Sequence, residues 1–322
     1  MQTAFSGTSA RSGPYYDLCL RVLDCETLPN GMIRSRLLKG LTTRTFFNYQ
    51  ISGAVGVIIR LYGKIDVDKL LAGVNQKDNP RASDMKEAAS RLTHPLIHGA
   101  ILADEVGLGK TQQSLLVAIL HRFLNDTQRA DDDSKVLYKP ILLVVPPTLI
   151  NQWLQELRSC WPGLRVIISY EGHDFKDVMA LASISHTAMK EYPAAEAIPR
   201  NLRYIFDTSD PKAAEAILLT SYNTHKLRTG TKKIKKVPGV AHKPPRYGLD
   251  GRMIWKKKPR KQPYWTTNHV NVYSLMIADE AQKIKNYSTG IWSILYLHSV
   301  RKTLLVTATP MYNSARVSIS LP

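Results

Sequence analysis

The stretch that most constrains the fold of this chain runs from Ala100 to Leu120 and reads AILADEVGLGKTQQSLLVAIL. The short apolar run at its start predicts a buried strand, and the amphipathic pattern at its end predicts a helix. Between them, Gly107 and Gly109 permit backbone conformations that a side chain would forbid. A strand, a tight turn and a helix in this order direct backbone N–H groups and a helix dipole at one point, so the stretch predicts a phosphate-binding loop.

Two polar residues after the turn extend this prediction. We expect Lys110 to supply positive charge to the β- and γ-phosphates of a nucleotide and the Thr111 hydroxyl to hold Mg²⁺. The usual pattern begins with Gly, where this chain has Asp104. An ordinary surface turn is the alternative for a bare Gly-Lys-Thr, but the flanking strand and helix favour the loop. The predicted nucleotide-binding residues of the loop are Asp104, Glu105, Gly107, Leu108, Gly109, Lys110 and Thr111.

The net positive charge of the chain indicates which kind of partner it binds. The chain of 322 residues has a net charge of +18 and a pI near 9.8. The segment Lys226–Lys261 holds 14 Lys or Arg residues against a single acid, Asp250, and so contributes +13 of that excess. We expect this segment, interrupted by aromatic residues, to contact DNA or an acidic protein surface, with Lys232, Lys233, Lys235 and Lys236 as nucleic-acid ligands. A solvated, disordered insertion is the open alternative.

Other compositional features exclude some classes of protein. No window is apolar for long enough to cross a bilayer, and the first residues lack the apolar segment of a secretion signal, so we expect no membrane partner. The three cysteines are odd in number and lack metal-ligand spacing, which is typical of a reduced, intracellular protein. The run KKKPRK, Lys256 to Lys261, has the composition of a nuclear import signal, so we expect the nucleus.

Apolar runs alternate with helical patterns along the chain. Besides the strand before the loop, strands are predicted at Ile141–Val145, Leu164–Tyr170, Ala216–Tyr222, Val272–Glu280 and Lys302–Pro310. A helix is predicted to be opened by Thr45, with Phe46 and Phe47 in the core, and two more, each begun by a capping residue, over Asp66–Val74 and Ser83–Leu92. Further helices are predicted over Leu149–Ser159 and Lys176–Lys190. This alternation predicts an α/β fold of three layers around a mostly parallel sheet. Residues 1 to about 40 have a mixed pattern that predicts little.

Two acids complete the predicted site. Asp279 and Glu280 follow the apolar run Leu275–Ala278, at the strand end where ligands of parallel sheets bind. A phosphate-binding loop needs such a partner, because Mg²⁺ must also be held from the opposite side and a water must be activated. We expect Asp279 to hold the metal and Glu280 to orient and deprotonate the attacking water.

The sequence that begins with these acids, DEAQKIKN, resembles the acidic motif of superfamily-two helicases in the form used by Swi/Snf-like DNA translocases and chromatin remodellers. ILADEVGLGKTQQ resembles the same branch's phosphate loop, including its Asp in place of the first Gly. VVPPTLINQWLQEL, LLTSYNTHK and LLVTATPMYN resemble three further motifs, and Tyr49, Gln50 and Gly53 match an upstream Tyr-Gln-x-x-Gly element. These elements cover about residues 46 to 313 in the family's order.

The resemblance implies a RecA-like first lobe over residues 45–322, with a helical insertion at 66–95, a basic insertion at 226–266 and an N-terminal extension at 1–44. It implies that Gln50 reads adenine, that Gln282 couples the site to motion and that Thr307 and Thr309 relay the nucleotide state. It also implies contacts to a nucleic-acid backbone from residues in two of the motifs. These residues are Thr148, Gln152, Trp153, Ser221 and Tyr222. Core positions for Trp153 and a plain strand end for Ser221 and Tyr222 are the open alternatives.

The implied function is an ATP- and Mg²⁺-dependent motor acting on duplex or nucleosomal DNA. In this family a second RecA-like lobe is required for full activity, and we expect that lobe to be absent here, with weak or no hydrolysis by this chain alone. A non-catalytic nucleotide- or nucleic-acid-binding interaction protein derived from such a lobe is the alternative. An RNA helicase is a third reading, which DEAQKIKN and the QW-containing motif disfavour.

Overall fold

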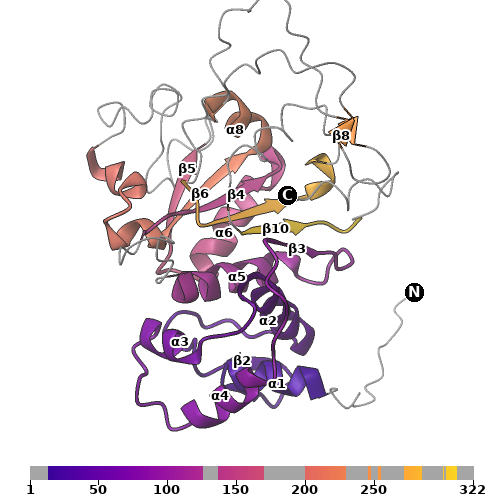
Figure 1. The fold of residues 1–322 in the computed structure, drawn as a ribbon, viewed down its shortest axis with the longest axis vertical. Coiled ribbons are helices and arrows are strands. Elements are labelled where there is room, and N and C mark those ends of the chain that lie inside the picture. The colour runs from indigo at the N-terminus through magenta and orange to yellow at the C-terminus, as the bar shows by residue number, and fades with distance from the viewer. Residues whose placement is uncertain are drawn as a thin grey trace, which may run out of the picture.

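The fold is taken from a computed structural model of the chain (Figure 1). The residues that it describes are 14–125, 137–169, 200–229, 246–247, 253–254, 272–284, 300 and 302–309. The predicted helix Lys176–Lys190 and most of the basic insertion, with its four candidate lysines and KKKPRK, lie outside them.

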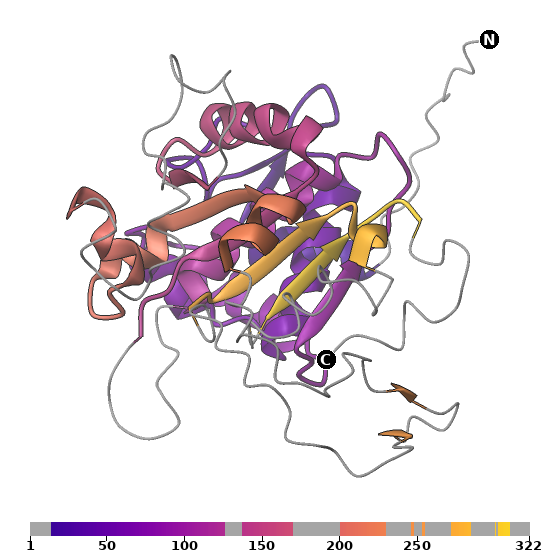
Figure 2. The ribbon, with the colours of Figure 1, turned by 90° about the horizontal axis from the view of Figure 1, so that it is seen from above.

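A six-stranded parallel sheet forms the centre of the described structure (Figure 2). Its strands alternate with crossover segments, as expected for parallel pairing. In chain order the strands are β3 (Gly99–Leu102), β4 (Ile141–Val145), β5 (Arg165–Ser169), β6 (Ala216–Ser221), β9 (Leu275–Asp279) and β10 (Thr303–Val306). Their order across the sheet is β3-β10-β9-β4-β6-β5, so β10, the last strand in the sequence, lies beside the first.

Helical segments cover both faces of this sheet. Helices α5 (Lys110–Asn125) and α6 (Ile150–Cys160) share one apolar cluster with alternate residues of β4. The intervening residues of β4 face a second cluster, which includes side chains from the 3₁₀ helix η4 (Arg200–Phe206) and from Tyr222 at the start of α8 (Tyr222–Thr229). Because side chains alternate along a strand, the two clusters lie on opposite faces. The expected three-layer α/β fold with a parallel sheet is therefore confirmed.

The residues before the sheet form a helical block beneath α5 (Figure 1). Helices α1 and α4 pack on each other, and α2 packs on α5. A short antiparallel hairpin lies between α1 and α2 in the sequence. The block's elements are α1 (Pro14–Val22), β1 (Cys25–Thr27), β2 (Ile33–Ser35), α2 (Asn48–Tyr62), α3 (Val67–Gly73) and α4 (Ala82–Ser90). The predicted insertion and the N-terminal extension thus pack together, which the mixed pattern of the first residues did not reveal.

The remaining short elements are 3₁₀ helices and one strand pair. The 3₁₀ helices are η1 (Pro147–Leu149), η5 (Pro211–Glu215) and η6 (Ala281–Ile284), and the pair is β7 (Arg246–Tyr247) with β8 (Met253–Ile254). Among the described residues, no helix has both the length and the apolar character needed to span a membrane.

Two local predictions were wrong. Helix α2 begins at Asn48 instead of Thr45, and Phe47, expected in the core, is 49% exposed. Phe47 precedes the helix in extended backbone, so its side chain points off the packed face. Helix α4 begins at Ala82 after Arg81, so Ser83 is not its cap, whereas Asp66 does cap α3 by accepting from the Lys69 N–H at 3.2 Å.

Candidate nucleotide-binding site

Three neighbouring strands end at the same level of the sheet. In the parallel registers, Val306 of β10 pairs with both Leu102 of β3 and Asp279 of β9. The residues that follow these strands are the phosphate-binding loop, Thr307 and Glu280. Segments that lie far apart in the sequence therefore meet at one carboxyl edge, which is the place where parallel sheets bind ligands.

The loop after β3 has the conformation that its glycines allow. Gly107 and Gly109 have φ values of +88° and +72°, which residues with a Cβ rarely adopt. The Lys110 Nζ folds over the loop and donates to the carbonyl oxygens of Asp104 and Glu105, each at 2.8 Å. Lys110 is also the first residue of α5. Its ammonium, the free amides of the first helical turn and the exposed loop backbone could together hold an anion.

Gln50 links helix α2 to this loop. Its Nε2 donates to the Leu108 carbonyl at 3.3 Å, and its Oε1 accepts from the Phe47 N–H at 3.0 Å. A Cβ on Gly109 would lie 2.2 Å from the Gln50 Nε2, so a side chain at this positive φ would also displace the Gln50 amide. The Tyr-Gln-x-x-Gly element therefore reaches the loop, and the amide of Gln50 is 7% exposed and bonded to the protein at both ends.

Asp104 stands where the usual loop pattern has Gly, and its carboxylate is held by a residue for which the sequence predicted no role. The Gln113 Nε2 of α5 donates to the Asp104 Oδ2 at 2.5 Å. Gln113 is fully buried and packs on Gly53, where a Cβ would lie 2.1 Å from the Gln113 Oε1. The signal in the sequence was the second Gln of GKTQQ, one helical turn after the loop. Asp104 thus fastens the loop to its helix.

Asp279 receives hydrogen bonds from three directions. The Trp153 Nε1 donates to its Oδ2 at 2.8 Å, the Glu280 N–H donates to its Oδ1 at 2.9 Å, and the Tyr222 hydroxyl donates to its backbone carbonyl at 2.6 Å. Burial raises the pKa of Asp279 above its usual value, whereas the Trp153 bond and the Lys110 ammonium act to lower that pKa. The charges of Lys110 and Asp279 therefore interact across the same edge.

Burial likewise raises the pKa of the Tyr222 hydroxyl well above its usual value, with the Asp279 and Glu280 carboxylates acting in the same direction. The hydroxyl therefore stays protonated and keeps donating to Asp279.

A chain of polar contacts runs from Glu280 to β10. Glu280 has a φ of +52°, a strained value for a residue with a side chain. Its carboxylate accepts from the Gln282 Nε2, and the Gln282 Oε1 accepts from the Thr307 hydroxyl at 2.7 Å. The Thr309 N–H in turn donates to the Thr307 Oγ1 at 3.1 Å. Four of the five predicted residues of these two motifs, Glu280, Gln282, Thr307 and Thr309, are thus brought into one connected chain.

The expected Mg²⁺ ligands fit an ion shared with a nucleotide. Among the described residues, no group of three or more His, Cys, Asp or Glu side chains could hold a metal ion by itself. Thr111 and Asp279 offer a hydroxyl and a carboxylate, which are hard oxygen donors. Magnesium commonly takes one or two protein ligands and completes its octahedron with phosphates and water.

The predicted nucleic-acid ligands divide into two groups. Thr148 and Gln152 are exposed, before and within the first turn of α6. Trp153, Ser221 and Tyr222 are 1%, 1% and 4% exposed, which favours the open alternatives of a core position for Trp153 and a plain strand end for Ser221 and Tyr222. Trp153 lies in the apolar cluster that contains α5, α6 and alternate residues of β4. The Ser221 Oγ accepts from the Thr224 N–H at the start of α8.

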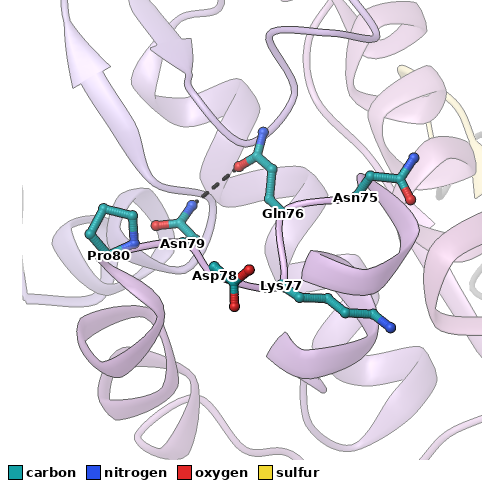
Figure 3. Close-up of a pocket in the computed structure, with 6 residues that line it drawn as sticks. All are labelled: Asn75, Gln76, Lys77, Asp78, Asn79 and Pro80. Carbon is teal, nitrogen blue, oxygen red and sulfur yellow. Dashed lines mark hydrogen bonds between the residues drawn. The ribbon is translucent and has the colours of Figure 1, made fainter.

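A separate hollow lies on the helical block (Figure 3). It is lined by the connection between α3 and α4, where the Asn79 Nδ2 donates to the Gln76 Oε1 at 3.2 Å. None of its lining residues belongs to the loop or to the acidic motif. The candidate site therefore rests on the convergence of motifs at the sheet edge.

A profile of the SNF2-related domain matches residues 49–321. The chain belongs to the SNF2-related domain family. It is 29% identical over 214 residues to the chromatin-remodeling ATPase INO80 of Lodderomyces elongisporus, a match that covers 66% of this chain and 10% of that protein. It is 28% identical over 216 residues to the DNA repair protein RAD5 of Yarrowia lipolytica, covering 67% and 15% respectively.

Two further similarities of this SNF2-related chain are shorter or weaker. Over 71 residues it is 39% identical to the DNA repair and recombination protein RAD26 of Saccharomyces cerevisiae, covering 22% of this chain and 6% of that one. The Sulfolobus solfataricus SWI2/SNF2 ATPase core in complex with dsDNA aligns at 17% identity and a TM-score of 0.42, over 87% of this chain and 35% of that chain. The chain spans about a tenth of the length of the INO80 relatives.

Proposed function

We propose that this chain is the ATP-binding lobe of a DNA-dependent ATPase that couples hydrolysis to movement along duplex DNA or to the remodelling of chromatin. The observation that carries the proposal is the shared carboxyl edge of β3, β10 and β9. There the loop with Lys110, the acids Asp279 and Glu280, and Thr307 meet in register. Family membership supports the same reading.

In this proposal the loop holds the nucleotide. Lys110 would exchange its contacts with the Asp104 and Glu105 carbonyls for the β- and γ-phosphates of ATP, since an ammonium binds phosphate oxygens more strongly than neutral carbonyls. Thr111 and Asp279 would hold Mg²⁺, which when bound neutralises charge on the transferring phosphoryl group. Gln50 would meet adenine at the start of α2, next to Leu108.

Glu280 would act in the hydrolysis step, and Gln282 would couple that step to motion. Glu280 would orient the attacking water and accept its proton. Its carboxylate is bonded to Gln282, which is bonded to Thr307, so a change at the terminal phosphate would be felt at β10. Thr307 and Thr309 would relay the nucleotide state along this chain.

The DNA surface would lie beside this edge. Thr148 and Gln152 are exposed at the start of α6, where hydroxyls and amides hydrogen-bond phosphate oxygens without reading bases. Lys232, Lys233, Lys235 and Lys236 of the basic insertion would add a charged surface for duplex or nucleosomal DNA, or for an acidic protein. The names of the INO80 and RAD5 relatives support a role on chromatin or in DNA repair, and hence in the nucleus.

Nucleotide binding tests the proposal most directly. We expect the chain to bind ATP with Mg²⁺ in a fluorescence titration, and Lys110→Ala to weaken this binding about 100-fold or more, because a charge-assisted contact to phosphate is lost. The control is Lys86→Ala, which removes an exposed lysine of α4 that pairs with Asp68. Equal affinities of wild type and Lys110→Ala would refute the assignment of the site.

A comparison of duplex DNA with duplex RNA tests the proposed substrate. We expect duplex DNA to bind more tightly, and Gln substitution of the four insertion lysines to lower the affinity and flatten its dependence on salt. Preference for RNA would favour the RNA helicase reading. An unchanged salt slope would remove the insertion from the DNA-binding surface.

A further inference from the structure

The indole of Trp153 is the one side-chain donor that the structure shows on the carboxylate of Asp279. Its Nε1 lies 2.8 Å from the Oδ2, and both side chains are buried, with Trp153 1% and Asp279 9% exposed. Trp153 belongs to α6 and Asp279 ends β9, so this bond joins a surface helix to the end of a central strand. A ring in this position cannot reach a nucleic acid.

The bond restricts how the carboxylate can rotate. The Oδ2 accepts from the indole N–H and the Oδ1 accepts from the Glu280 N–H, so each oxygen of the carboxylate is held by one donor. The Tyr222 hydroxyl holds the backbone carbonyl of the same residue at 2.6 Å. Each oxygen keeps a further lone pair, so a metal ion can still bind, but only along directions that these donors leave.

We propose that Trp153 is a positioning residue, which orients the Asp279 carboxylate for Mg²⁺ bound with a nucleotide. This inference rests on the proposed nucleotide-binding function. Trp153 touches neither substrate nor metal and acts only through Asp279. Partners that orient a metal-binding carboxylate in this way commonly change metal affinity when they are removed.

The chain supplies a matched control for this role. Trp161 directly follows the last residue of α6, is also 1% exposed, and lies in the same apolar cluster as Trp153. Within the described residues, however, its Nε1 has no hydrogen-bond partner. Replacing either tryptophan by phenylalanine removes a similar volume from the core, but only the change at position 153 removes a donor to Asp279.

The test separates metal binding from nucleotide binding. ATP affinity is measured for wild type, Trp153→Phe and Trp161→Phe, once with Mg²⁺ and once with EDTA. We expect Mg²⁺ to strengthen ATP binding by wild type and by Trp161→Phe. In Trp153→Phe the Mg²⁺-dependent gain should fall about 10-fold, with affinity in EDTA unchanged. An equal Mg²⁺-dependent gain in the two variants would overturn the inference.

A second variant covers the case in which Trp153→Phe does not fold. Incorporation of 3-benzothienylalanine at position 153 keeps the bicyclic ring and replaces the N–H by sulfur, so packing is retained and only the donor is lost. The same selective loss of the Mg²⁺-dependent gain is expected, and its absence would contradict the positioning role. If wild type itself binds no ATP, the proposed function fails instead, so the two failures are distinguishable.

Discussion

Helix α5 has a polar cluster at each end, and the two clusters differ in kind. At its start, Lys110 and Gln113 hold the phosphate-binding loop, next to exposed residues such as Val106. Near its end, His121 is 1% exposed and bonded on both ring nitrogens, to the Tyr62 hydroxyl at 2.7 Å and to the Ser274 hydroxyl at 3.0 Å. The first cluster lies at the carboxyl edge of the sheet and the second at the opposite edge.

The cluster at the His121 end is buried, whereas the cluster at the start of α5 combines the buried Gln113 with an exposed loop. At the His121 end, burial lowers the pKa of the imidazole to about 3, and the Lys302 ammonium acts in the same direction. Lys302 lies over the Tyr62 ring, 4.4 Å from its centroid. His121 therefore stays neutral and joins α2, α5 and the residue before β9. At the loop end, by contrast, the backbone has positive φ at Gly107 and Gly109 and the loop is open to solvent. Positive-φ glycines and an exposed backbone thus mark the candidate ligand end, whereas a neutral side chain bonded on both ring nitrogens marks the structural end.

After Lys110→Ala, the largest effect is expected from Gly109→Ala, which changes only the loop end. Alanine would bring a positive-φ cost of about 1–2 kcal/mol. It would also displace the end of the Gln50 side chain from the Leu108 carbonyl, at a cost of about 1 kcal/mol for the lost hydrogen bond. ATP affinity should fall by about 100-fold, as measured by titration. Gly40→Ala is the control, since a Cβ there meets nothing within 4 Å. Unchanged ATP affinity in Gly109→Ala would mean that the loop conformation is not what binds phosphate.

A smaller effect is expected at the other end, as a dependence of stability on pH. The pKa of His121 is lower in the folded chain than its ordinary value of 6.5, so the unfolded chain takes up a proton first as pH falls. The stabilisation is present above pH 6.5 and is lost progressively toward pH 3. By pH 5 wild type should have lost about 2 kcal/mol more unfolding free energy than His121→Gln.

Urea unfolding of both proteins between pH 7.5 and 5 measures this difference, and the other histidines cancel in the comparison. Parallel pH curves for wild type and His121→Gln would show that the imidazole is not held neutral. ATP affinity at neutral pH should be the same for both proteins, because the cluster lies away from the loop.

The smallest effect is expected from Gln113→Leu, which removes one hydrogen bond at the loop end. Loss of the bond to Asp104 should weaken ATP binding by about 1 kcal/mol. The adjacent Gln112→Leu is the control, because the Gln112 Nε2 donates at 2.5 Å to Glu156 of α6 and not to the loop. If both variants bind ATP equally, Asp104 does not need its link to α5.

Much of the fold was predictable because apolar runs in a parallel sheet are nearly continuous. The predicted run Ile141–Val145 has the same bounds as β4. The apolar runs that lead to Ser221 and Asp279 form β6 and β9, which end at those two residues. Helix starts were predicted less well. Asp66 caps α3 as expected, but Thr45 and Ser83 do not cap helices, because packing of the apolar face decides where α2 and α4 begin.

Sequence by itself determined which polar residues and glycines stand next to strand ends: Gly107, Gly109, Lys110, Asp279 and Glu280 were predicted from residue type and position, and the fold brings these strand ends to one edge. Local backbone preference and strand hydrophobicity are short-range properties, so they can be read along the chain.

Only the tertiary structure decided which way polar side chains face. Trp153 and Gln152 are neighbours in the sequence, yet one is bonded to Asp279 in the core and the other is exposed. Gln113 and His121 found partners on other elements of the fold, Asp104 and Ser274. Such contacts join residues that are close only after the strands have paired, and their geometry depends on burial that no local pattern records.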